Sequence, residues 1–96
     1  MYARLAAFVG GDVEKLREAG EARDAAGSMF PEPVRRAFVL GTPDGSQRLM
    51  ITFFDSEEAL EGAEAEFDRM GDEIPEEVRG TRVAREVYEV LVSWPG

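Results

Sequence analysis

Apolar residues alternate with polar ones, or run almost without interruption, in four short segments of the chain. These segments cover residues 2–9, 34–40, 48–54 and 82–92, and their lengths and patterns are typical of β-strands. Between them, residues 13–26 and the segment that follows Asp55 carry apolar side chains at helical spacing. The pattern therefore predicts six elements in the order β-α-β-β-α-β.

The ends of these segments carry turn and capping residues. Residues 43–45, Pro-Asp-Gly, separate the second and third strands and predict a β-hairpin. Asp12 and Asp55 precede the two helices and are predicted N-caps, with Glu58 placed to complete a capping box. Residues 75–80 begin with proline and end with glycine, which predicts one further helical turn.

This order of elements, with one hairpin, predicts an α+β fold of the ferredoxin-like type. Such a fold has a four-stranded antiparallel sheet with two helices on one face. Residues 1–96 are enough for a single domain. The apolar face of the first helix, residues 13–26, has few large side chains. This helix can therefore lie close to the sheet or leave space beneath it.

The third strand is apolar on both of its faces. Leu49, Ile51 and Phe53 point to one side of the sheet, whereas Met50 and Phe54 point to the other. Both faces of this sheet are therefore expected to be covered, yet the chain has helices for only one. Packing against the sheet of a second copy is the simplest cover, and the sequence predicts a homodimer.

Composition removes several classes of function. The net charge of −9 opposes binding to nucleic acid or to an anionic membrane surface. The chain has no cysteine and no histidine, so it offers neither a thiolate nor an imidazole to a metal, a haem or a substrate. No dinucleotide-binding glycine motif is present, and no cofactor is expected. With no signal-peptide pattern and no apolar run of membrane-spanning length, a cytoplasmic location is expected.

One acidic helix face has the spacing of a possible metal site. Glu57, Glu61 and Glu64 are spaced to share a face of the second helix, as the ligands of a hard cation would be. A solvated helix face accounts for the same spacing, and no metal site is predicted.

Two segments carry a resemblance to a known family. Residues 51–60, ITFFDSEEAL, and residues 85–93, REVYEVLVS, resemble antibiotic-biosynthesis-monooxygenase-like proteins of the dimeric α+β-barrel superfamily. The resemblance extends over the whole chain in element order and implies a dimeric α+β barrel. It also implies a pocket between the sheet and the helices.

The enzymes of that family are cofactor-independent oxygenases of aromatic polyketides and haem-degrading proteins. They tend to use asparagine on the first strand and tryptophan on the second helix, often with histidine further along it. This chain has no asparagine or histidine, and Ala63 stands about where the tryptophan would be. Whether the chain is an enzyme is left open, and no catalytic residue is assigned.

A pocket of this kind would suit a small apolar or aromatic ligand. The residues expected to contact the ligand are Arg23, Phe53, Phe67, Met70 and Tyr88. Core or dimer packing explains the aromatic side chains equally well, and arginines on apolar stripes, such as Arg4, Arg36 and Arg85, more often pair with an acid.

Three functions are compatible with the sequence. The first is a small homodimeric binding protein with an apolar cavity. The second is a cofactor-independent monooxygenase acting on an activated aromatic substrate, and the third is an interaction module without a pocket.

Overall fold

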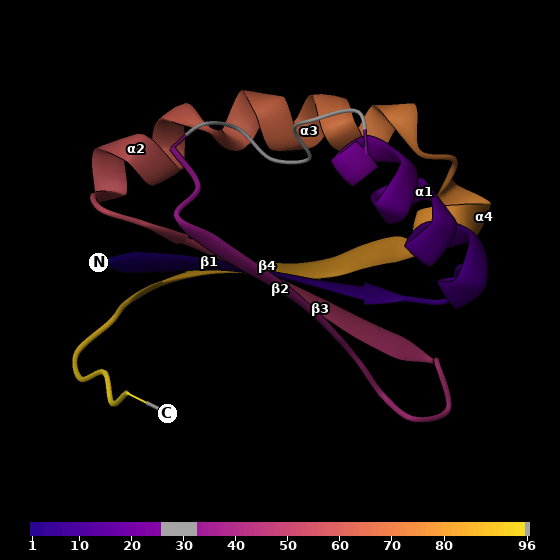
Figure 1. Ribbon diagram of the computed structural model, residues 1–96, viewed down its shortest axis with the longest axis horizontal. Helices are drawn as coiled ribbons and strands as arrows, with labels where there is room; N and C mark the ends of the chain where they lie inside the picture. The colour runs from indigo at the N-terminus through magenta and orange to yellow at the C-terminus, as the bar shows by residue number, and fades with distance from the viewer. Residues whose placement is uncertain (26–32, 96) are drawn as a thin grey trace.

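Four strands form one antiparallel sheet in the order β2-β3-β1-β4 (Figure 1). The computed structural model describes residues 1–25 and 33–95, apart from the side chains of residues 23–25 and 72. The strands are β1 (Tyr2–Val9), β2 (Arg36–Gly41), β3 (Gln47–Phe54) and β4 (Thr81–Glu89). This is the α+β, ferredoxin-like sheet that the sequence predicts.

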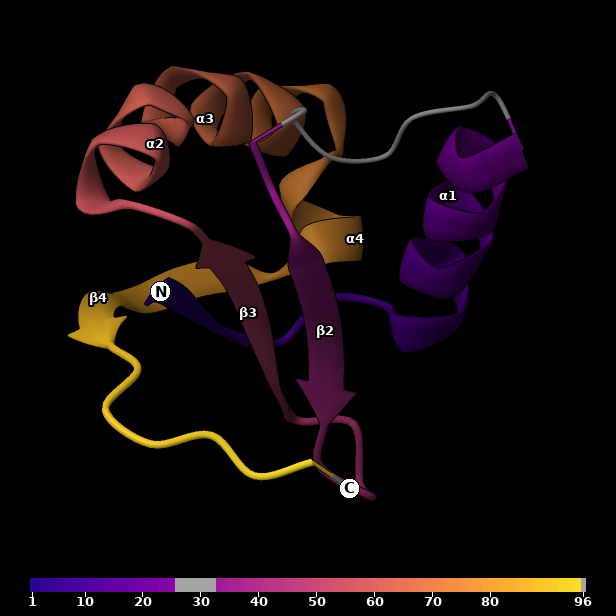
Figure 2. The ribbon, with the colours of Figure 1, turned by 60° about the vertical axis from the view of Figure 1, so that its left-hand side comes forward.

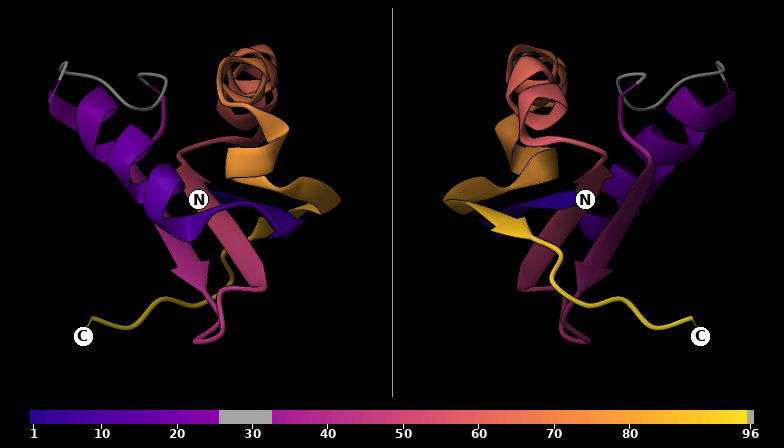
Figure 3. Two further views of the ribbon diagram at one scale, coloured as in Figure 1. Left: turned by 90° about the vertical axis from the view of Figure 1, so that its right-hand side faces the viewer. Right: turned by 90° about the vertical axis from the view of Figure 1, so that its left-hand side faces the viewer.

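The helices all lie on one side of this sheet (Figures 1 and 3). They are α1 (Val13–Ala25), α2 (Glu57–Gly62), α3 (Glu64–Glu73) and the short α4 (Glu76–Arg79). No helix of the described residues covers the other side, which is called the open face below. Nor is any helix in the described part of the chain long and apolar enough to cross a membrane.

The register of the strands decides which side chains meet the helices. On β3, Phe54 lies opposite Tyr2 of β1 and Thr52 lies opposite Arg4, so all four point toward the helices. Phe54 joins Leu60, Ala63 and Phe67 of the helical layer in the hydrophobic core. Neighbouring strand residues point the other way.

The first helix begins as predicted, and the second does not. The Asp12 carboxylate accepts the backbone N–H of Lys15 at 3.1 Å. For the second helix the predicted cap, Asp55, is wrong, because Ser56 accepts the N–H of Ala59 at 3.1 Å. Asp55 is turned outward and forms an exposed ion pair at 2.6 Å with Arg35.

The single second helix predicted from the sequence is broken into α2 and α3 at Ala63. The backbone N–H of Ala63 bonds to the carbonyl of Leu60, three residues back, at 3.2 Å. A three-residue step tightens the turn and ends the regular helix. The helical segment then passes Gly71, its predicted end, and stops at Glu73. The extra turn between Pro75 and Gly80 is confirmed as α4.

The last strand is shorter than predicted. Glu89 is the final residue of β4 that has a partner on β1, and that partner is Tyr2, the first residue of β1. Residues 90–92 thus have no strand beside them to pair with, although the N–H of Val90 still bonds to the carbonyl of Met1 at 2.9 Å. The tail beyond β4 runs off on the side of the open face (Figures 1 and 2).

The predicted hairpin between β2 and β3 is held by Asp44. Its carboxylate accepts the backbone N–H of Ser46 at 3.0 Å and the hydroxyls of Thr42 and Ser46 at 2.7 Å each. These bonds, led by the one from the Ser46 backbone, lower the pKa of Asp44 to about 2. Gly45 completes the turn with a φ of +76°, a conformation that glycine adopts without strain.

Candidate ligand-binding site

A cleft lies above the sheet between α1 and α3. Figure 3 shows the ribbons of these two helices standing apart. The volume of the cleft is about 1330 Å³, above the range of roughly 300–1,000 Å³ that is common for ligand pockets, because one side is open. Val13, Leu16 and Gly20 line it from α1. The small stripe of α1 noted in the sequence accounts for this space, since it brings few large side chains down to the sheet.

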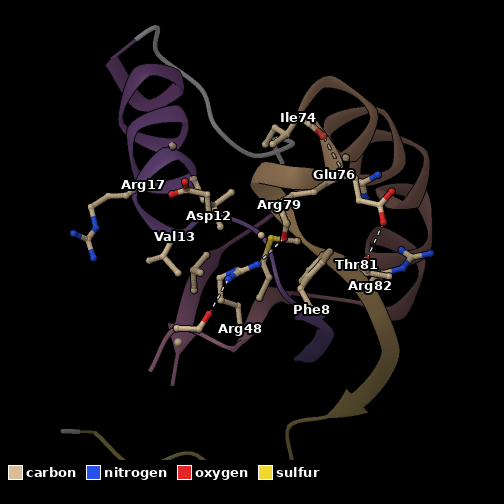
Figure 4. A pocket seen from close by; sticks show the side chains of 18 of the residues that line it. Phe8, Asp12, Val13, Arg17, Arg48, Ile74, Glu76, Arg79, Thr81 and Arg82 are labelled. Carbon is tan, nitrogen blue, oxygen red and sulfur yellow. Dashed lines mark hydrogen bonds between the residues drawn. The ribbon is translucent and has the colours of Figure 1, made fainter. Parts of the chain in front are cut away.

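The inner surface of the cleft is mainly apolar. Phe8 of β1 and Met50 of β3 belong to its floor, and Phe67 and Met70 of α3 belong to its wall. Ile74 follows at the C-terminal end of α3 (Figure 4). A flat ring could lie between these side chains, because aromatic and methionine groups adapt to such a surface.

Arg48 closes the end of the cleft near the hairpin. Its side chain is 3% exposed, and its guanidinium donates to three backbone carbonyls: Gly10, Arg79 at 2.9 Å and Gly45 at 3.4 Å (Figure 4). These carbonyls belong to three segments that are far apart in the sequence. Arg48 thus ties together the β1–α1 connection, the end of α4 and the hairpin.

Two glycines make room for this arginine. A Cβ atom at Gly11 or at Gly80 would lie 2.6 Å or 2.5 Å from Nη2 of Arg48, and both residues have a positive φ. Side chains at either position would therefore clash and be strained. The role of Arg48 that follows from these contacts is structural.

The other buried arginine, Arg4, belongs to an ion cluster beneath α3. Its Nε atom donates to Glu64 at 2.6 Å, and its guanidinium lies 4.4 Å from the centre of the Phe67 ring. Arg85 of β4 donates to the same carboxylate at 2.8 Å. The sequence left open whether these arginines pair with acids, and in the structure both pair with Glu64.

The carboxyl of Glu64 responds to opposing influences. Burial raises its pKa, but the hydrogen bonds and charges of Arg4 and Arg85 outweigh that effect and hold the pKa below the ordinary value of 4.5. A carboxyl whose pKa is lower in the folded chain stabilises the fold above its unfolded pKa. The stabilisation is lost as pH falls through the folded value.

Glu64→Gln is therefore expected to make the free energy of unfolding fall less steeply as the pH is lowered. At pH 7 the variant should be less stable than the wild type, and the difference should shrink as pH falls below about 4.5. Urea unfolding at a series of pH values measures this. If the difference in free energy of unfolding between the two proteins stays constant from pH 7 to pH 3, the ionised carboxylate has no stabilising role.

Three buried polar atoms have no partner in the described residues. They are Nη1 of Arg4, Oγ1 of Thr52 and Nε of Arg48. Arg4 and Thr52 face each other across β1 and β3 on the helix side. Buried polar groups are normally hydrogen-bonded, so unpaired ones call for an explanation.

The structure does not bring the five expected ligand contacts together. Phe67 and Met70 line the cleft, but Phe53 and Tyr88 lie on the open face, where both are opposite Ala3. One pocket containing all four is therefore wrong, because a sheet separates the two pairs. The side chain of Arg23 lies outside the described residues.

Tyr88 is half exposed on the open face, and its hydroxyl donates to Glu86. This hydrogen bond raises the pKa of the Tyr88 phenol. The phenol is thus kept in its neutral form and faces away from the cleft.

Sequence reasoning missed Thr52 and Arg48 as residues of interest. A partial signal was present, since both share the parity of Met50 and Phe54 on β3 and so lie on the same face of the sheet as those residues. What the sequence could not show is that Nε of Arg48 and Oγ1 of Thr52 have no hydrogen-bond partner among the described residues.

The acidic helix face does not form a metal site in the described residues. Glu64 is occupied by Arg4 and Arg85. Among the side chains that the structure describes, no three acidic groups gather as metal ligands would.

Comparison with known proteins gives the fold and no more. No family model matches the chain, and no curated protein matches it. Among solved structures, the chain is similar to Rv0793 from Mycobacterium tuberculosis, with a TM-score of 0.62, 20% sequence identity and 96% of each chain covered. At that identity the likeness shows a shared small α+β fold with a four-stranded antiparallel sheet.

Proposed function

We propose that this protein binds a small apolar or aromatic ligand in the cleft between α1, α3 and the sheet. The observation that carries the proposal is the cleft itself, whose lining includes the apolar side chains of Phe8, Met50, Phe67 and Met70. Concave sites that combine apolar side chains with placed polar groups are the usual form of small-molecule sites.

This proposal is favoured over the other two functions. An interaction module would not need an apolar cleft on its helical side. A cofactor-independent monooxygenase would have to ionise its substrate, and among the described residues the titratable groups that line the cleft are arginines and carboxylates. Carboxylates titrate near pH 4 unless strongly shifted, so they are weak bases at neutral pH. Binding without chemistry is the simpler function for this site.

Leu16→Gln is expected to weaken binding of a naphthalene-based fluorescent probe. Leu16 lines the cleft from α1 and is half-buried. Loss of apolar contact worth about 1.4 kcal/mol would lower the affinity roughly tenfold. A fluorescence titration measures it. Lys15→Gln, on the exposed side of the same helix, is the matched control and should bind as the wild type does. Equal affinities in all three proteins would place the probe elsewhere.

We further propose that two copies of the chain pack through their open faces. This face carries large apolar side chains that no helix of the described residues covers. Of these, Phe38 is 40% exposed, Leu40 49% and Tyr88 50%. Isolated apolar side chains on a surface are ordinary, but a contiguous set marks an interaction site.

The tail beyond β4 would enlarge that contact. Leu91, Val92 and Trp94 are 84%, 62% and 81% exposed, and the tail runs along the side of the open face (Figure 2). In a dimer these side chains would reach the second copy. The resemblance of residues 51–60 and 85–93 to a family of dimeric barrels supports the same arrangement. Light scattering during size exclusion should give twice the mass of the 10.6 kDa chain.

A further inference from the structure

We propose that the ligand of the cleft is an organic anion, whose ionised oxygen binds between Nη1 of Arg4 and Oγ1 of Thr52 under α3. This proposal rests on the proposed binding function and adds the chemical class of the ligand. It names an aromatic carboxylate, or a molecule with an equivalent oxyanion, in place of a neutral hydrocarbon.

The first observation is a pair of donors without acceptors. Arg4 and Thr52 are directly opposite on β1 and β3, and the Cβ atoms of such a pair lie about 4.5–5.5 Å apart. Arg4 is 2% exposed and Thr52 fully buried, and neither Nη1 nor Oγ1 has a partner in the part of the chain that the structure describes. A guanidinium N–H and a hydroxyl can both donate to one oxygen that lies between them.

The second observation is the charge of the cluster. Arg4 and Arg85 carry one positive charge each and share the single carboxylate of Glu64. Within the described residues, neither pairs with a further acid. Asp68, also on α3, is 3.9 Å from Arg82 instead. The cluster thus has one unit of positive charge in excess, and one anionic oxygen would balance it.

The third observation is the position of Arg4 at the cleft. Arg4 is one of the residues that line it, together with Phe67, whose ring the guanidinium contacts. An aromatic ligand could pack against Phe67 and Met70 while its carboxylate reaches Nη1. Both polar atoms are shielded from solvent, so the ligand reaches them only when neighbouring side chains move.

The test compares 2-naphthoate with 2-naphthamide, a neutral molecule of nearly the same shape. Calorimetric titration of the wild-type protein should show naphthoate binding at least about tenfold more tightly, because charge-assisted hydrogen bonds are the stronger kind. If neither compound binds, the proposed function itself fails. If both bind equally, the cleft takes apolar rings and the inference of an anion is wrong.

Variants then locate the anion. Thr52→Val keeps the size of the side chain and removes only the unpaired hydroxyl, so it should fold while losing about three- to tenfold in naphthoate affinity. Arg4→Gln should remove the preference for naphthoate over naphthamide. Arg69→Gln, at an exposed position of α3, is its matched control and should keep it.

Two outcomes would overturn the location. One is a naphthoate preference that survives in both Thr52→Val and Arg4→Gln, which would place the anion at another arginine. The other is an unchanged affinity in Thr52→Val with a clear loss in Arg4→Gln, which would leave the hydroxyl without a role. A thermal melt of each variant confirms that it is folded before its titration is interpreted.

Discussion

Phe54→Ala is expected to lower the free energy of unfolding by about 3–5 kcal/mol. Phe54 is fully buried at the end of β3, and its ring meets Phe67 edge-on with the ring centres 6.2 Å apart. Leu60 and Ala63 complete the same cluster. The chain is short and its core small, so the cavity left by the ring would remove a large share of its stability. Urea unfolding followed by circular dichroism measures the change.

Phe53→Ala is the matched control for this prediction. Phe53 is the neighbouring residue but lies on the open face, where it contacts Phe38 edge-on at 6.3 Å between ring centres. Its loss should cost less within one chain. If copies associate through this face, its effect should also depend on protein concentration, since dimer stability includes association. A smaller cost for Phe54→Ala than for Phe53→Ala would mean that the core has been assigned to the wrong face.

The sequence predicts the fold because the fold depends on the order of its apolar segments and turns, which can be read directly. Each strand segment is short and either alternating or almost wholly apolar, and Pro43-Asp44-Gly45 allows little but a turn between β2 and β3. What the sequence does not predict correctly is where the second helix begins and where it breaks. Ser56 caps in place of Asp55, and the helix breaks at Ala63. Both features depend on local backbone angles. Asp55 and Ser56 are adjacent and both can cap a helix, and an alanine such as Ala63 does not by itself mark a break.

The candidate site was less predictable for a different reason. Aromatic residues on β3 and β4 suggested a pocket, but parity alone does not say which face the helices cover. Phe53 and Tyr88 therefore fell on the wrong side. The unpaired atoms of Arg4 and Thr52 depend on what the neighbouring helix brings to them. That information exists only when β1, β3 and α3 are placed together.

Phe38→Lys is expected to convert the proposed dimer into a monomer. Phe38 sits on the edge strand β2 and points to the open face, with Arg36 stacked on its ring at 4.9 Å. The change removes an aromatic contact and places an ammonium group beside that arginine, inside a surface that the second copy would cover. Loss of an interface aromatic typically costs ~2 kcal/mol or more, and a buried unpaired charge adds to this. The dimer dissociation constant should rise at least about 30-fold.

Val39→Lys separates this effect from any general damage to the strand. Val39 is the next residue of β2, 54% exposed and pointing to the helix side, opposite Met50. The same lysine there changes the net charge equally and the strand propensity similarly, but it does not enter the open face. Sedimentation equilibrium should thus show a monomer for Phe38→Lys and a dimer for Val39→Lys. If both variants keep the mass of the wild type, the open face is not the contact between copies. If both become monomers, the edge of the sheet forms the contact and not its face.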